Sequence, residues 1–437
     1  MRFGIVLGAC FVLAFVGGPQ VPVAHAARLT LLEALEHARE RAPELQAARA
    51  RLSAVDGARR QASLFFQNNP ELGFDGAHGG PFGNPGERSY ALTVSQELEV
   101  AGQPMLRGEV ADLDYRAARA RLAADERAYA ARVAAAFFDS LASRHRTRLL
   151  RDVRDLNVEL FSVSERRLRA GDVAEVEHNL ILIERDRARA EARAAEAAQE
   201  VADAELNRLL GNPADAAVEA EGALPDPTRF TDHSAGSARM DVQAARLARL
   251  ARAEEAALAA REVFPNPTLS LGWERTVSTV GPDDFGGDRD LAATLGGFVD
   301  TDDVILFRVS LPLPLFNRSQ GRIEEAKAKF LAARYEAVAV ERTVSAEAAS
   351  ALATLRASSA AVSLFGDTLP IAERNLALLV KAFKAGQIDA TTLLAARDRA
   401  FRARLDYLNA RRDYAMALVD LIRARGEDPA TALEEPK

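Results

Sequence analysis

Two long stretches without proline constrain the fold of this chain more than any other feature. No proline occurs at residues 105–170 or 319–369, so nothing in either stretch forces the backbone out of a helix. At about 1.5 Å per residue, a helix over 104–170 would be roughly 100 Å long. The sequence therefore predicts long rods and not a compact globule.

Apolar residues in both stretches recur every seven positions. They are Tyr115, Leu122, Tyr129 and Ala136, then Phe330, Ala337, Val344 and Ala351. This period indicates supercoiled helices packed side by side. Shorter helices follow at 172–210 and 387–425, each about 60 Å long. We expect the neighbour of a rod to be two helices stacked end to end, with 239–264 extending 172–210.

The chain has two similar halves. Gln-Ala-Ala-Arg at 46–49 returns at 243–246, an offset of 197 residues, and Ala170-Gly171 returns as Ala385-Gly386 at an offset of 215. The offset changes between the two strand patterns of each half, where the longer segment 275–303 is expected to be an exposed loop. Several matches at constant spacing predict an internal duplication.

The halves define the expected domains. The first repeat is 27–220, with initial helices, a β-hairpin at 70–100, a long helix at 104–170 and a return helix at 172–210. The second repeat is 221–437, with a helix at 239–264, a hairpin at 268–315, a long helix at 319–385, a return helix at 387–425 and a short tail. Thr30 and Glu33 have capping-box spacing, Pro43 is expected to begin a second helix, and Pro370 is expected to kink the second rod.

The first 26 residues have the layout of a cleaved secretory signal. Arg2 precedes an apolar run from Phe3 to Val16, and Ala24-His25-Ala26 follows,. An inner-membrane anchor is the alternative, but the run is shorter than the ~20 residues of a spanning helix. Cys10 lies in a lipoprotein-like "LGAC", although the apolar run continues beyond it. We expect an exported mature chain without cysteine, disulfides or a later apolar run of transmembrane length.

The strand patterns alternate between apolar and polar residues. In each strand one face is apolar, and the residues expected to face lipid are Tyr90, Leu92, Val94, Leu98, Leu269, Leu271, Trp273, Ile305, Phe307, Val309 and Leu311. A half-buried strand in a soluble sheet would show the same alternation. The strand lengths, however, suit a membrane barrel, the other faces carry charges, and the chain shows no further strand pattern to build a covering sheet.

Four strands cannot close a barrel in lipid. Known membrane barrels start at about eight strands, and an open edge in lipid leaves backbone groups unsatisfied at several kcal/mol each. We therefore expect a barrel shared between copies, and three copies would supply twelve strands.

Together these stretches resemble the TolC-type outer-membrane efflux channel family over essentially the whole mature chain. "RLRAGDVAEVE" and "KAFKAGQIDA" resemble the helical-hairpin tips of that family, and "VSLPLPLFNRSQGRIEEAKA" looks most like its CzcC-like branch, which exports heavy-metal cations. The resemblance implies a mainly α-helical homotrimer with a 12-stranded β-barrel in the outer membrane of a Gram-negative cell. A long α-helical barrel would continue it across the periplasm. The implied function is a passive exit duct for a proton-driven resistance-nodulation-division pump in the inner membrane.

The resemblance also implies where partners touch. The tip turns that would contact a periplasmic adaptor (a membrane fusion protein) are Arg169, Ala170, Gly171 and Asp172, and Lys384, Ala385, Gly386 and Gln387. A glycine at a helix end also has a purely structural use, because it relieves left-handed strain. Candidates for a gate or a cation-focusing ring are Asp172, Glu175, Glu177 and Asp389, although most charges on such helices are simply solvated.

The sequence indicates no chemistry of its own. It has no His-x-x-x-His pair, no phosphate-binding glycine loop and no serine nucleophile elbow,, so we expect no enzyme activity, no cofactor and no structural metal. The net charge of −7 argues against nucleic acid as a partner,. Two alternatives remain: a drug-efflux or type I secretion channel of the same fold, and a soluble periplasmic coiled-coil scaffold or adaptor.

Overall fold

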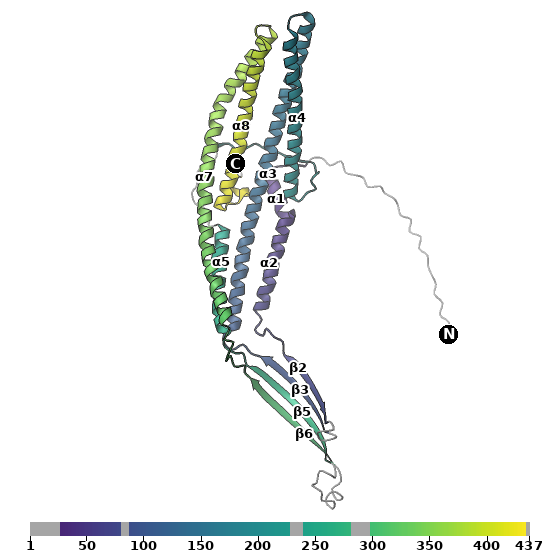
Figure 1. Ribbon diagram of the computed structural model, residues 1–437, viewed down its shortest axis with the longest axis vertical. Coiled ribbons are helices and arrows are strands. Elements are labelled where there is room, and N and C mark those ends of the chain that lie inside the picture. Colours follow the sequence, from purple (N-terminus) through teal and green to yellow (C-terminus); the bar gives the residue numbers. More distant parts are fainter. Residues whose placement is uncertain (1–26, 80–86, 228–238, 281–297, 434–437) are drawn as a thin grey trace, which may run out of the picture.

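The computed structural model describes residues 27–79, 87–227, 239–280 and 298–433. Figure 1 shows an elongated wall of helices that run side by side, with one small sheet at the far end. The helices are α1 (Leu31–Arg41), α2 (Pro43–Ala62), α3 (Gln103–Ala170), α4 (Glu175–Leu210), α5 (Met240–Arg261), α7 (Gln320–Lys384), α8 (Ala390–Arg425) and α9 (Pro429–Ala432). The helices expected from the sequence end within three residues of the observed ones.

The wall is one layer of four rods. The single helix α3 contacts α2 and α4 on one side and α5 and α8 on the other, and the single helix α7 contacts α5 and α8. Figure 1 shows α2 in line with α4, and α5 in line with α8. Each long helix therefore has neighbours made of two shorter helices, as expected from their lengths.

The expected pairing of the stacked helices was wrong. Helix α4 is extended by α2 and not by α5, because its C-terminal Gly211 lies against the start of α2, where an added Cβ would be 3.0 Å from the carbonyl oxygen of Arg41. The same arrangement recurs in the second half, where Gly426 at the end of α8 lies against Arg239 before α5. Both glycines adopt positive φ values of 77° and 71°, which lets the chain leave the helix where another begins.

The residues expected to cap or begin helices lie at the observed helix ends. Thr30 and Glu33 form a reciprocal capping box before α1, with the Thr30 amide donating to Glu33 Oε2 at 2.8 Å,. Pro43 occupies the first turn of α2. Pro370 lies inside α7, which continues through it as one helix to Lys384.

One pair of strands was missed in the sequence. β1 (Ala27–Leu29) pairs in parallel with β4 (Val218–Ala220) beside the middle of the helical wall. Three residues per strand are too few to show an alternating pattern. We call this pair of short strands the strap. Arg144 of α3 anchors it to the helices, because its guanidinium donates to the Val218 carbonyl and lies 3.2 Å from Asp203 Oδ2.

The end sheet is antiparallel throughout, in the order β2-β3-β5-β6. Its strands are β2 (Glu71–His78), β3 (Arg88–Glu97), β5 (Thr268–Val280) and β6 (Phe298–Ser310). The expectation that 275–303 is all loop was wrong, since β5 and β6 pair from Thr268 with Ser310 out to Val280 with Phe298. Within the described residues β2 and β6 have no partner on their outer edges.

The hydrophobic core lies in the middle of the wall and not in the sheet. Buried side chains of α1, α3, α4 and α8 meet there, among them Phe137, Leu206 and Leu210. The Tyr129 hydroxyl in this core donates to the Leu209 carbonyl at 2.7 Å. Among the described side chains of the sheet, no large apolar one is buried. In a single chain the sheet is therefore held by its ladder hydrogen bonds and by cross-strand contacts such as the Arg275–Asp303 ion pair.

Candidate functional site

The strand register sorts the sheet into two chemically different faces. Residues directly opposite each other in an antiparallel pair point to the same face, and Leu92 is opposite Phe74 and Trp273, while Trp273 is opposite Ile305. The next row of the same face joins Leu72, Val94, Leu271 and Phe307. We call this side the apolar face.

Nine of the eleven expected lipid-facing residues lie on the apolar face. They are Tyr90, Leu92, Val94, Leu269, Leu271, Trp273, Ile305, Phe307 and Val309. The other two, Leu98 and Leu311, lie just beyond the ends of β3 and β6. The register also places Leu72 and Phe74 of β2 on this face, two residues that were not expected from the sequence.

The side chains of the apolar face are exposed to an extent that is unfavourable in water. Phe307 and Ile305 are 70% and 77% exposed, and Phe74 is 70% exposed. Contiguous exposed apolar surface of this kind marks contact with lipid or with another protein.

The opposite face, which we call the polar face, carries charges that are mostly acidic. Its charged residues are Glu71, Asp75, Glu97, Glu274, Asp300, Asp302 and Arg308. Between them lie small residues such as Thr93, Ser95 and Ser270. A sheet with one apolar face and one polar face is suited to form a wall between lipid and a water-filled lumen.

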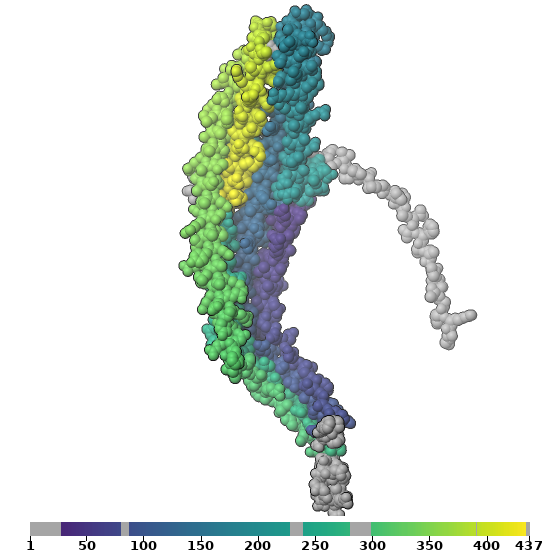
Figure 2. Space-filling model, viewed as in Figure 1, coloured from purple at the N-terminus to yellow at the C-terminus, as the bar shows by residue number. Residues whose placement is uncertain are grey.

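Both long edges of the helical wall also expose apolar residues. Figure 2 shows α7 along one long side of the molecule and α4 above α2 along the other. On α7, Leu364, Ile371 and Leu378 recur every seven residues and are 59–68% exposed. On α4, Val176 and Ile183 have the same spacing and are 71% and 62% exposed. Seven-residue stripes of this kind are the seams of coiled coils.

Helix α7 is also the one described helix that is long and apolar enough to cross a membrane by length and composition. It contains an 18-residue window of mean hydropathy 1.3, of which 11% is buried. This differs from the expectation that no such run follows the first 26 residues. Alanine, valine and leucine raise the mean, but the serines between them break up any obvious apolar block.

The two helical hairpins end side by side at the tip farthest from the sheet (Figure 1). Their turns have the same geometry: Gly171 and Gly386 have φ values of 80° and 73°, and the amides of Asp172 and Gln387 donate to the carbonyls of Arg167 and Ala382, each at 2.9 Å. The remaining tip residues expected from the sequence are placed around these turns; they are Arg169, Ala170, Lys384 and Ala385.

Three contacts join the hairpins near the tip. Lys384 Nζ lies 2.7 Å from Glu159 Oε1 of α3, and the Arg167 guanidinium lies over the Phe383 ring at 5.5 Å. Phe383 packs there with Leu160, Ile181 and Leu393. These contacts connect α7 and α8 to α3 and α4.

A buried arginine forms a fourth connection. Arg397 of α8 is 7% exposed, and its guanidinium donates to Asn157 Oδ1 of α3 and to Glu184 Oε2 of α4, the latter at 2.7 Å. One side chain thus bridges both hairpins. Sequence reasoning missed Arg397, Asn157 and Glu184, since they lie 240 and 213 residues apart and no local pattern marks them.

The four acidic gate candidates are not gathered into one cluster. Asp172 is exposed in the first turn, while Glu175 and Glu177 begin α4. Asp389 caps α8, because its carboxylate accepts from the Thr391 hydroxyl and the Thr392 amide at 2.5 and 3.0 Å. These hydrogen bonds lower the pKa of Asp389 to about 2.

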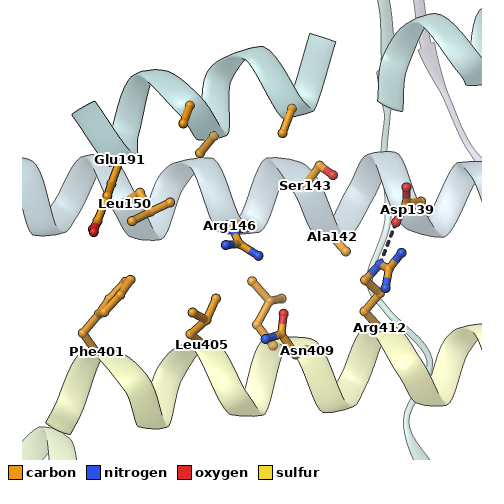
Figure 3. A pocket seen from close by; sticks show the side chains of 14 residues that line it. Asp139, Ala142, Ser143, Arg146, Leu150, Glu191, Phe401, Leu405, Asn409 and Arg412 are labelled. Carbon is orange, nitrogen blue, oxygen red and sulfur yellow. Dashed lines mark hydrogen bonds and ion pairs between the residues drawn. The ribbon is translucent and has the colours of Figure 1, made fainter. Parts of the chain in front are cut away.

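Between the tip and the core, a groove of about 680 Å³ separates α8 from α3 and α4. Figure 3 shows Arg146 and Leu150 of α3 facing Phe401 and Leu405 of α8 across it. At the end of the groove nearest the core, Arg412 Nε lies 2.6 Å from Asp139 Oδ1. The hairpins are therefore in contact near the tip and near the core, and the groove lies between these two regions of contact.

The described residues contain no group of three or more histidine, cysteine, aspartate or glutamate side chains placed to hold a metal ion.

The chain is similar to known proteins over most of its length. Residues 233–427 match the sequence model of a family described as "Outer membrane efflux protein". The chain is 26% identical over 406 residues to the cobalt-zinc-cadmium resistance protein CzcC of Cupriavidus metallidurans, which covers 89% of this chain and 88% of that protein.

Solved channels share its fold. The chain matches CusC with a TM-score of 0.72 at 16% identity, covering 91% of this chain and 92% of the other. It matches the CmeC outer membrane channel of Campylobacter jejuni with a TM-score of 0.74 at 16% identity, covering 91% and 85%. It matches the open state of the MtrE outer membrane channel of Neisseria gonorrhoeae with a TM-score of 0.69 at 20% identity, covering 91% and 89%.

Proposed function

We propose that the chain is an outer-membrane channel of a Gram-negative cell, the passive exit duct of a tripartite efflux system. Its similarity to the outer membrane efflux protein family over residues 233–427 and to the cobalt-zinc-cadmium resistance protein CzcC over 89% of its length supports this proposal. The single observation that carries this proposal is the end sheet. It has one exposed apolar face, one acidic face and two open edges.

The open edges call for further copies of the chain. A four-stranded sheet with free edges is not stable in lipid, since each unsatisfied backbone group costs several kcal/mol. Pairing β6 of one copy with β2 of the next would close the sheet, and three copies would supply twelve strands. The unit that works in the membrane is therefore a homotrimer.

The helical edges support the same assembly. The exposed seven-residue stripe on α7 lies along one long side of the wall and the stripe on α4 along the other. In a closed ring each copy presents different surfaces to its two neighbours, so α7 of one copy would pack against the α2 and α4 edge of the next. The result is a helical tube that continues the barrel.

The tips are the proposed site of the periplasmic adaptor. The turns at Gly171 and Gly386 lie side by side at the end of the molecule farthest from the sheet. Arg169 and Asp172 of the first turn and Gln387 of the second are exposed there. The adaptor would connect the tube to an inner-membrane pump of the resistance-nodulation-division class, which supplies the energy.

The proposed cargo is heavy-metal cations. This rests on the likeness to the cobalt-zinc-cadmium resistance protein and on the acidic polar face, which would concentrate cations inside the barrel. Deleting the gene should sensitise cells to zinc, cobalt or cadmium salts, and a plasmid copy should restore growth. Sensitivity to dyes and antibiotics alone would instead show a drug channel.

A membrane fractionation separates the channel from a soluble scaffold. The proposal expects the chain in the outer-membrane fraction, and recovery from the soluble periplasm would overturn it. The cation ring at the tip can be tested on the purified channel with Asp389→Asn. Asparagine caps a helix as well as aspartate does, so the change removes the charge and keeps the turn. Unchanged conductance and ion selectivity would exclude Asp389 from the ring.

A further inference from the structure

All four links between the helices and the end sheet carry exposed apolar side chains. They lie between α2 and β2, between β3 and α3, between α5 and β5, and between β6 and α7. We call them the junction collar, which consists of Leu64, Phe65, Phe66, Val100, Phe264, Leu311, Leu313, Leu315 and Phe316. None of these side chains is less than 48% exposed, and Phe316 is 93% exposed.

The apolar face of the strands is too short to span a membrane by itself. On β6 its continuous apolar run is Ile305, Phe307 and Val309. The next residue outward on that face is Asp303, paired with Arg275 at 2.8 Å, and Val299 lies beyond this charged pair. From Ile305 to Val309 the strand advances about 13 Å. With the usual tilt of membrane-barrel strands, this covers about 10 Å of a band that is about 25 Å tall.

The junction collar supplies most of the missing height. Leu311 and Leu313 continue the alternation of β6 beyond its last ladder pair at Ser310. From Val309 to Leu313 the extended chain adds about 13 Å along its length, or about 10 Å across the membrane at the same tilt. The chain then turns, because the Leu315 amide donates to the Leu313 carbonyl at 2.9 Å,. The apolar band is thus about 20 Å tall, with this turn and Phe316 at its edge.

Charge at the far side of the collar indicates what covers it. Arg261 at the end of α5 and Arg318 before α7 are exposed, and neither forms an ion pair within the described residues. Guanidinium groups beside an apolar belt match the phosphates of phospholipid headgroups beside acyl chains.

We propose that the junction collar lies in the periplasmic leaflet of the outer membrane, a proposal that rests on the proposed channel function. Its occupant is phospholipid, with Arg261 and Arg318 at the headgroup phosphates. The edge of the membrane therefore lies near Phe316, in the links, and not at Ser310, where β6 ends.

Spin labels can test this position directly. The chain has one cysteine, Cys10, so Cys10→Ser gives a background in which each new cysteine is unique. Phe316→Cys and Leu313→Cys probe the collar, and two sites guard against misfolding of one variant. Ile305→Cys on the apolar face and Gln243→Cys, an exposed position on the central rod α5, are the matched lipid and water controls.

The labelled trimer is placed in vesicles of phosphatidylethanolamine and phosphatidylglycerol, and collisions with oxygen and with a water-soluble nickel chelate are measured. Both collar labels should resemble Ile305→Cys, reached by oxygen and shielded from nickel. If they resemble Gln243→Cys while Ile305→Cys stays in lipid, the collar proposal fails and the channel proposal stands. Labels shielded from both reagents and broadened by neighbouring labels would show that another copy covers the collar, which also overturns it. If Ile305→Cys itself meets nickel, the membrane role of the sheet fails.

Discussion

Replacing Phe307 by lysine should prevent the sheet from entering the membrane. Phe307 is 70% exposed in the middle row of the apolar face, opposite Leu271. A lysine near the middle of the lipid face of a barrel costs about 2–4 kcal/mol. That is roughly a 30- to 1,000-fold change in the folding equilibrium of each chain, and it is incurred three times in a trimer.

The adjacent residue provides a matched control. Leu306 is on the same strand but on the polar face, opposite Gly272, and Leu306→Lys adds the same charge where water would surround it. The amount of trimer in outer-membrane fractions is measured by electrophoresis of unheated samples. Phe307→Lys should deplete the trimer strongly, whereas Leu306→Lys should leave it near the wild-type amount. Equal amounts of both variants, or the reverse order, would refute the assignment of the two faces.

Three further predictions concern the helices. Arg397→Ala should destabilise the contact between the hairpins by about 2–3 kcal/mol, since it removes the donor to Oδ1 of the buried Asn157 and leaves Glu184 with Arg187 at 4.0 Å as its ion-pair partner; hydrogen exchange near Asn157 should speed up, and unchanged protection would contradict this role. Gly211→Ala should lower the midpoint of thermal unfolding more than Gly171→Ala, because both glycines have positive φ but only Gly211 has a backbone oxygen 3.0 Å from the new Cβ; equal losses would contradict it. The depressed pKa of Asp389 means that its cap contributes above the unfolded pKa of about 3.9 and is lost as pH falls through about 2,; the protection factors of amides in the first turn of α8, which correct for the intrinsic pH dependence of exchange, should therefore hold at pH 4 and fall below pH 2, and a loss of protection already at pH 4 would argue against the cap.

The elements that the sequence predicts well are those with a long repeated signal. The seven-residue period and the absence of proline predict α3 and α7, and alternation predicts the phase of β3 and β5, because each depends on local spacing alone. The turn at Gly386 follows from the turn at Gly171 through the constant offset of 215 residues.

What the sequence analysis missed depends on contacts between distant residues. The stacking of α4 on α2 depends on the contact between Gly211 and Arg41. The periodicity of a helix sequence does not indicate which two helix ends are in contact. The strap of β1 and β4 has three residues per strand, too few for a period to emerge. The bridge from Arg397 to Asn157 and Glu184 joins three helices through buried polar groups, and each looks like an ordinary helix surface residue in the sequence.

We propose that one chain supplies only part of a closed wall. Native mass spectrometry of the protein extracted from outer membranes in detergent counts the chains in each particle directly. Three chains per particle are expected, with no folded single chain in the membrane extract. A stable particle with one chain, whose sheet edges at β2 and β6 remain unpaired, would contradict it.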